Sequence, residues 1–249
     1  MMLQKMISLF PVVLLACCFP HLTLATVLQG VTYRTVAPTF PSTLDSCLIS
    51  KTKAKVASRT VCASLCSQTT GCLLYCTDGE ECTFFSAEVT DGWEGVTGNS
   101  VAYSFQRCYT SLPHDLTAQA TASHSMQYAS YIPQNLITGI FCGSYPGVYY
   151  TGNSLNAWWQ VDFGSPKTVS RIRLKVSKSY YSQVSFYLGN SSTYSHNSVV
   201  AGPEQTEKSL SSVSGRHSVE VDIQPSTGQY FTIVQAVSSW LGMYSVQIF

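Results

Sequence analysis

Residues 158–163 read Trp-Trp-Gln-Val-Asp-Phe, and after Gly-Ser-Pro at 164–166 the chain continues with Ser-Arg-Ile-Arg-Leu-Lys-Val at 170–176. In this last stretch the isoleucine, leucine and valine alternate strictly with two arginines and a lysine. A two-residue period places apolar side chains on one face of a β-strand and basic side chains on the other. Glycine and proline at 164–166 predict a turn between two strands. This part of the chain therefore favours a half-buried antiparallel sheet.

The sequence that follows extends the same pattern. Further apolar or alternating segments lie at 184–188, 219–223, 230–237 and 244–249. They are separated by residues typical of turns, and no segment among them reads as a convincing helix. Several short strands of this kind predict an antiparallel β-sandwich or barrel.

The cysteines divide the chain into two parts. Of ten cysteines, two lie in the first 25 residues, seven lie between Cys47 and Cys108, and only Cys142 lies beyond. The composition changes at the same place, near a Ser-Leu-Pro sequence at 111–113. We therefore expect a cysteine-rich module at 26–110, a linker at 111–115 and a β-sandwich at 116–249; both modules are of ordinary domain size.

The first 25 residues have the pattern of a secretory signal peptide. A single lysine precedes an apolar run at 6–19, and Thr-Leu-Ala at 23–25 supplies small residues for cleavage. The run is too short to span a bilayer comfortably, and no basic segment follows it, which disfavours an uncleaved anchor. We expect a secreted, extracellular protein that does not span the membrane, with N-glycosylation at the sequon of Asn190.

Composition and motifs exclude several classes of function. A net charge of +1 and 11% charged residues provide no basic surface for nucleic acid. Nucleophile-elbow, zinc-protease, phosphate-loop and dinucleotide-binding motifs are absent from the sequence, and the histidines have no acidic partner at motif spacing. The sequence therefore predicts no catalytic residues and no enzyme activity.

The cysteine-rich module has a compact local pattern. Residues 58–68 read as one helix, in which Cys62 and Cys66 are four apart and share a face. Residues 72–76 and 82–85 read as the two strands of a hairpin joined by an Asp-Gly turn. Disulfides between such elements would stabilise a module with a small core.

Zinc is the competing explanation for this cluster. Successive cysteines from Cys62 to Cys82 are separated by three, five, three and five residues, and no histidine lies in the module. This spacing matches neither paired Cys-x2-Cys ribbons nor Cys/His fingers. In an oxidising compartment an even number of cysteines indicates disulfides.

The pattern resembles the PAN/apple domain, in which six cysteines surround one helix and an antiparallel sheet. The similarity covers roughly residues 28–109. It implies the pairings Cys47–Cys108, Cys62–Cys82 and Cys66–Cys72. Cys76 is additional to the family pattern, and the only other cysteine of the mature chain outside that pattern is Cys142, which would be its partner. The alternative is that either thiol joins a second chain.

The second module resembles two related families. Ala-Ser at 122–123, Tyr-Ala-Ser at 128–130, Asn-Leu-Ile-Thr-Gly at 135–139 and the paired tryptophans resemble the opening of a discoidin (coagulation-factor C-type) domain. The segments 186–191, 228–232 and 244–249 are similar to those of F-type lectins. The similarity covers about residues 116–249. It implies a jelly-roll β-sandwich of the galactose-binding-domain type, whose loops at one end bind glycans or lipid headgroups. The expected fold class is therefore mainly β, with an α+β cysteine-rich module before the sandwich.

The family's binding residues do not carry over. Fucose-binding lectins of this type use a histidine before the paired tryptophans and two arginines in the loop before the Gly-Asn-Ser strand. Residues 149–156 contain no histidine, and residues 176–182 contain no arginine and no adjacent cysteine pair. Fucose specificity is therefore not predicted.

The family's calcium site is also altered. The corresponding positions look like Thr138, Gly139, Ile140 and Ser245, none of which is acidic. Calcium needs oxygen ligands and usually negative charge. The sequence predicts no cofactor and argues against a structural calcium ion or another metal.

The loops still carry aromatic and basic side chains suited to ligand contact. The candidate ligand-binding residues are Tyr149, Tyr150, Lys175, Lys178, Tyr180, Tyr181 and Trp240. Tyrosine and tryptophan stack on sugar faces, and the lysines would accept anionic groups. The alternative is that the tyrosines only fill the ends of the sandwich. Trp158 and Trp159 are predicted to pack in the structure, and the basic face of 170–176 to be a solvated outer face.

The sequence thus predicts a secreted, non-catalytic recognition protein. Its expected partners are extracellular glycans, glycoproteins or anionic headgroups, in adhesion or defence. The alternative is a structural extracellular-matrix or secreted-layer protein that uses both modules for protein–protein contacts and has no sugar pocket. The oligomeric state is left open.

Overall fold

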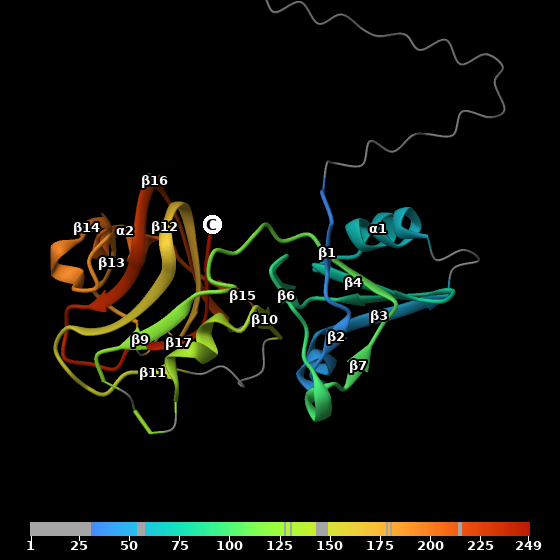
Figure 1. The fold of residues 1–249 in the computed structure, drawn as a ribbon, viewed down its shortest axis with the longest axis horizontal. Coiled ribbons are helices and arrows are strands. Elements are labelled where there is room, and N and C mark those ends of the chain that lie inside the picture. The colour runs from blue at the N-terminus through green and yellow to red at the C-terminus, as the bar shows by residue number, and fades with distance from the viewer. Residues whose placement is uncertain are drawn as a thin grey trace, which may run out of the picture. The chain divides into compact units, whose positions relative to one another are not determined.

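The computed structural model describes most of the chain after residue 30. The described residues are 31–53, 58–126, 128, 129, 131–142, 149–177, 179, 181–213 and 216–249. Val31–Phe249 is one compact unit (Figure 1). Within the described residues, no helix is both long and apolar enough to cross a membrane.

The N-terminal part is built on a five-stranded antiparallel sheet. In spatial order its strands are β1 (Arg34–Val36), β8 (Arg107–Thr110), β4 (Leu74–Asp78), β5 (Glu81–Phe85) and β3 (Leu48–Lys53). A second, two-stranded sheet joins β2 (Thr39–Phe40) to β7 (Tyr103–Ser104). Short 3-10 helices are η1 (Ser42–Cys47) and η2 (Gly98–Ser100).

One helix, α1 (Arg59–Gln68), packs on this sheet. It begins at Ser58, whose hydroxyl accepts a hydrogen bond from the Val61 backbone N–H at 3.3 Å, an N-cap that satisfies one unpaired helix donor. Cys62 and Cys66 point inward and are buried. The predicted helix and the predicted β4–β5 hairpin are confirmed.

Three disulfides lie in the described part of the chain. Cys62–Cys82 and Cys66–Cys72 form as the PAN/apple resemblance implies. The third joins Cys76 to Cys108, so the expected pairings Cys47–Cys108 and Cys76–Cys142 are wrong. The reason is the strand register, because Cys76 on β4 lies directly opposite Cys108 on the neighbouring strand β8, with their Cα atoms 4.1 Å apart.

The C-terminal part is a β-sandwich in which eight described strands form one hydrogen-bonded network. The main path runs β11 (Tyr149–Tyr150), β17 (Gly242–Ile248), β12 (Ala157–Val176), β16 (Arg216–Gln235), β13 (Val184–Gly189) and β14 (Ser198–Ala201). β9 (Thr121–His124) also pairs with β12, and β15 (Leu210–Val213) with β16. β10 (Ile140–Phe141) pairs instead with β6 (Glu88–Val89) of the cysteine-rich part.

The two longest strands correct the sequence prediction. The turn expected at 164–166 does not separate two strands, because β12 is continuous through it, as is β16 through 224–229. The two strands shift register together between Asp162 and Lys167, where Gly164 has a φ of +74°. The first half of β12 pairs with β9 and the second with β17, so one strand serves both layers (Figure 1).

Helical segments also accompany the sandwich, which the sequence did not predict. The α-helix α2 (Pro203–Lys208) has proline in its first turn, and Lys208 Nζ pairs with Glu204 Oε1 at 2.6 Å. Two 3-10 helices, η3 (Pro133–Ile137) and η5 (Tyr194–His196), join strands.

The strict alternation at 170–176 is confirmed. Ile172, Leu174 and Val176 are buried in the sandwich core. On the other face, Arg171 Nε lies 2.6 Å from Asp222 Oδ1, and Arg173 bonds Glu220 across the same strand pair. The two arginines of this face are thus matched by acidic cross-strand neighbours, whereas Lys175 lies opposite Ser218.

Asp115 joins the segment between the two modules to the last strand. Its carboxylate Oδ1 accepts hydrogen bonds from the backbone N–H groups of Thr117, at 2.9 Å, and Ile248, at 3.1 Å. Burial raises the pKa of Asp115 above the usual aspartate value, while these hydrogen bonds act in the opposite direction. The folded state therefore holds the proton more tightly than the unfolded chain.

This shift predicts the effect of the Asp115→Asn substitution. A raised folded-state pKa stabilises the fold at low pH, and this contribution is lost as the pH rises from about 4 through the raised value. Asparagine keeps the accepting oxygen without the buried charge, so we expect the variant to be more stable by roughly 1 kcal/mol at pH 7. Urea unfolding at pH 4 and pH 7 measures this, and the advantage should shrink at pH 4. An equal loss of stability at both pH values would contradict the prediction.

Candidate functional site: an aromatic cluster at the loop end

Three segments of the sandwich meet at one end, called here the loop end. Thr151 N–H donates to Leu241 O at 3.2 Å, which joins the segments 149–156 and 236–241. Ala236 N–H donates to Gln183 O at 3.0 Å, which brings in the segment before β13. The segments that the family comparison singled out are therefore neighbours in the fold.

Four aromatic residues gather there and are called here the aromatic cluster: Tyr128, Tyr131, Tyr150 and Trp240. The ring centroids of Tyr128 and Trp240 are 4.5 Å apart, and those of Tyr131 and Tyr150 are 5.5 Å apart. Tyr128 is exposed, and the other three are half-buried. The cluster therefore presents ring surface to solvent while its members support one another.

Exposed apolar side chains border the aromatic cluster. Met126 is 49% exposed and Ile132 is 48% exposed, each two residues or fewer from a cluster tyrosine in sequence. Gly152 N–H donates to Met126 O, which holds the loop before Tyr128 against the segment 149–156.

The backbone of this loop is unusual. Ala129, between Tyr128 and Tyr131, has a φ of +53°, in the left-handed region that a residue with a Cβ rarely adopts. Such conformations cost energy and gather at binding and active sites. Here the turn orients the two tyrosine rings in a stacked pair, 6.3 Å apart.

The candidate binding residues that the sequence predicted fall into different parts of the structure. Tyr150 and Trp240 belong to the aromatic cluster. Tyr149 and Tyr181 are instead buried in the sandwich core, as in the alternative that tyrosines fill its ends, and this corrects their assignment as contact residues. Lys178 and Tyr180 lie outside the described residues.

Lys175 does not join the aromatic cluster. Its Nζ lies 2.8 Å from Glu88 Oε1 and 5.9 Å from the centre of the Phe141 ring. The lysine therefore contacts β6 and β10. This finding corrects the prediction that Lys175 faces an anionic ligand at the loop end.

Tyr128 and Tyr131 were missed as site residues. Their signal in the sequence was two tyrosines three residues apart in a loop that ends at Ile132-Pro133. The approach of this loop to Trp240 depends on pairings far apart in the chain and is not visible in the sequence.

His124 lies on β9, near the core tyrosine that precedes Tyr150. Its ring centre is 5.9 Å from that of the buried Tyr149, and burial lowers its pKa below the usual histidine value. The imidazole is therefore neutral at physiological pH. The described part of the loop end does contain one carboxylate, that of Glu207, which accepts a hydrogen bond from Gln183 N–H at 2.9 Å.

The positions related to the family's calcium site lie elsewhere. Thr138, Gly139, Ile140 and Ser245 line a separate cavity. In the described part of the chain, no group of three or more histidine, cysteine, aspartate or glutamate residues is placed to hold a metal ion.

Solved structures with a similar sandwich include several carbohydrate-binding modules. Chitosan-binding module 1 from a Paenibacillus sp. IK-5 chitosanase/glucanase is 18% identical, with 55% of this chain and 98% of the module covered and a TM-score of 0.44. A fucolectin from striped bass (Morone saxatilis) serum is 16% identical, with 68% of this chain and 57% of the fucolectin covered and a TM-score of 0.45. A fucose-binding module from Streptococcus pneumoniae is 16% identical, with 54% of this chain and 94% of the module covered and a TM-score of 0.42.

No curated protein matches the sequence. Residues 143–233 match the family model described as the NedA-like, galactose-binding domain, a match that covers less than half of the chain and runs from before β11 into β16.

Proposed function

We propose that the aromatic cluster binds carbohydrate, and that the protein is a non-catalytic recognition protein. The observation that carries the proposal is the set of four rings at the loop end, with centroids 4.5–6.3 Å apart and partly exposed. Pyranose rings have apolar C–H faces that pack on aromatic rings and hydroxyl groups that bond polar neighbours. Tyrosine and tryptophan supply both kinds of contact at low conformational cost.

The surroundings of the cluster favour a neutral ligand. Met126 and Ile132, close to the cluster tyrosines in sequence, are apolar, the carboxylate of Glu207 at the loop end accepts a hydrogen bond from Gln183 N–H, and Lys175 is paired elsewhere. An anionic lipid headgroup would lack a matching cation among these residues. The match of residues 143–233 to a galactose-binding family model supports the same class of ligand.

The test is binding of the purified chain, residues 26–249, to a broad glycan array, followed by calorimetry with the best glycan. Trp240→Ala and Tyr128→Ala each remove one ring of the closest pair. We expect each to weaken binding at least tenfold, which corresponds to about 1.4 kcal/mol. Circular dichroism would verify that each variant is folded.

A matched control is Tyr194→Ala. Tyr194 is also half-buried and stacked edge-on with another tyrosine, Tyr187, at 5.3 Å, but η5 follows the opposite end of β13 from the loop end. The glycan affinity of the Tyr194→Ala variant should equal that of the wild type. A blank array with folded protein would reject the sugar site and favour the alternative of a matrix protein, and binding only to anionic vesicles would favour a headgroup ligand.

We also propose that the protein is secreted. Residues 1–25 have the signal-peptide pattern, and the described part contains three disulfides, which persist in oxidising compartments. Asn190 is exposed after β13 and available for a glycan. Mass spectrometry of protein from the culture medium should find Thr26 as the first residue and a glycan on Asn190. Retention of all protein inside the cells would contradict the proposal.

A further inference from the structure

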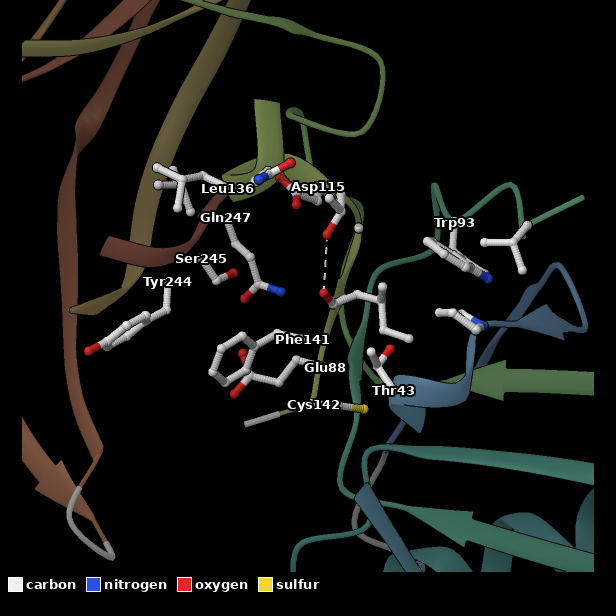
Figure 2. A pocket seen from close by; sticks show the side chains of 17 residues that line it. Thr43, Glu88, Trp93, Asp115, Leu136, Phe141, Cys142, Tyr244, Ser245 and Gln247 are labelled. Atoms are coloured by element: carbon white, nitrogen blue, oxygen red, sulfur yellow. Dashed lines mark hydrogen bonds between the residues drawn. The ribbon is translucent and has the colours of Figure 1, made fainter. Parts of the chain in front are cut away.

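A cavity of about 280 Å³ lies beside β6, β10 and β17 (Figure 2). It shares no lining residue with the aromatic cluster. Its walls combine apolar side chains, among them Leu136 and Phe141, with a few polar groups, among them Glu88 and Gln247. Small-molecule sites in proteins have this composition, with few polar groups that fix the orientation of an apolar ligand.

Gln247 points into this cavity. On β17 it alternates with the core residues Val246 and Ile248, so its side chain leaves the sandwich on the opposite face (Figure 2). Gln247 is only 4% exposed, and its Oε1 has no hydrogen-bond partner among the described residues. A buried amide oxygen without a donor is costly, so a donor from a ligand would stabilise it.

Glu88 supplies a second acceptor from the facing strand. Its Oε1 pairs with Lys175 Nζ at 2.8 Å, whereas its Oε2 is buried without a hydrogen-bond partner in the described part of the structure. Lys175 therefore balances the charge of the carboxylate, while its second oxygen is left to accept a further donor.

The cavity offers acceptor atoms and aromatic faces to a ligand and supplies no cationic side chain of its own. Its lining contains two carboxyl groups, those of Glu88 and Asp115, and no lysine, arginine or histidine. Lys175 already shows how an ammonium group is held here, with a carboxylate oxygen at 2.8 Å and the Phe141 ring centre at 5.9 Å. Aromatic walls from Trp93 and Phe141 add the faces that attract organic cations.

We propose that this cavity binds a small organic molecule with a primary ammonium group. The ammonium donates to Gln247 Oε1 and Glu88 Oε2, and the apolar body packs against Leu136 and Ile140. This site is independent of the proposed carbohydrate site and adds a second ligand to the protein.

The probe is n-butylammonium, titrated into residues 26–249 in an amine-free buffer and followed by NMR chemical shifts. We expect saturable binding with a Kd of about 1 mM, with shifts centred on the indole of Trp93 and the methyl groups of Leu136 and Ile140. Equal concentrations of n-butanol and sodium chloride should give no such response. An identical response to butanol would overturn the assignment of an ammonium ligand.

Gln247→Met tests the site itself. Methionine has nearly the same volume but no carbonyl oxygen, so we expect the affinity to fall about tenfold while the fold is retained. The matched control is Gln235→Met, because Gln235 is a fully buried glutamine whose Oε1 also lacks a partner among the described residues but does not line the cavity. Glu88→Gln provides a second test by removing the charge. Unchanged butylammonium affinity in folded Gln247→Met and Glu88→Gln would overturn the proposal.

Discussion

Replacement of Trp159 by alanine is expected to lower the free energy of unfolding by about 3–5 kcal/mol, the range for removal of a large buried aromatic side chain. Trp159 is fully buried in the sandwich core, and its indole N–H donates to Pro133 O at 3.1 Å. The substitution therefore leaves a cavity and also removes a side-chain donor from the Pro133 carbonyl. Urea unfolding followed by circular dichroism measures the change.

Trp158→Ala is the matched control for this prediction. Trp158 is the preceding residue of the same strand and is half-buried on the opposite face, while its backbone bonds to Ser125 do not depend on its side chain. We expect this substitution to lower the free energy of unfolding by about 1 kcal/mol. Similar losses for both tryptophans would show that the core does not lie on the Trp159 side of β12.

The sequence predicted local features of the fold well. The alternation of Ile172, Leu174 and Val176 is set by the two-residue period of a strand, which needs no knowledge of the rest of the chain. The helix at 59–68 has a local start signal at Ser58. α2 also had local signals, Pro203 and the Glu204–Lys208 pair, but its six residues are too few to show a periodicity.

The features that failed depend on strand register. Cys76 pairs with Cys108 because β4 and β8 lie side by side, and no spacing along the chain shows which cysteines face each other. The burial of Tyr149 likewise follows from the pairing of β11 with β17. Because side chains alternate along a strand, Tyr149 points into the core while the next residue, Tyr150, belongs to the aromatic cluster.

Cys47 and Cys142 lie close together in the cysteine-rich part of the fold. Both are buried in one apolar cluster. The Ser46 hydroxyl donates to Cys142 O at 2.6 Å, and Cys47 Sγ lies 3.9 Å from the carbonyl oxygen of Phe141, the residue before Cys142. We therefore predict a fourth disulfide, Cys47–Cys142. Two thiols form it by exchange with an oxidised small-molecule disulfide, which takes up the two electrons and two protons and becomes two thiols.

This bond would close a much longer loop than any disulfide already described. Its cysteines are 95 positions apart, whereas Cys66 and Cys72 are separated by 6. In the chain-entropy description, loss of the longer crosslink costs roughly twice as much, so Cys47→Ala/Cys142→Ala should lower the free energy of unfolding by about 4 kcal/mol and Cys66→Ala/Cys72→Ala by about 2 kcal/mol. Peptide mapping without reduction should recover Cys47 linked to Cys142. A peptide that links either cysteine to a second chain would overturn the prediction and favour the matrix-protein alternative. Such a link would also appear as a dimer that dissociates on reduction.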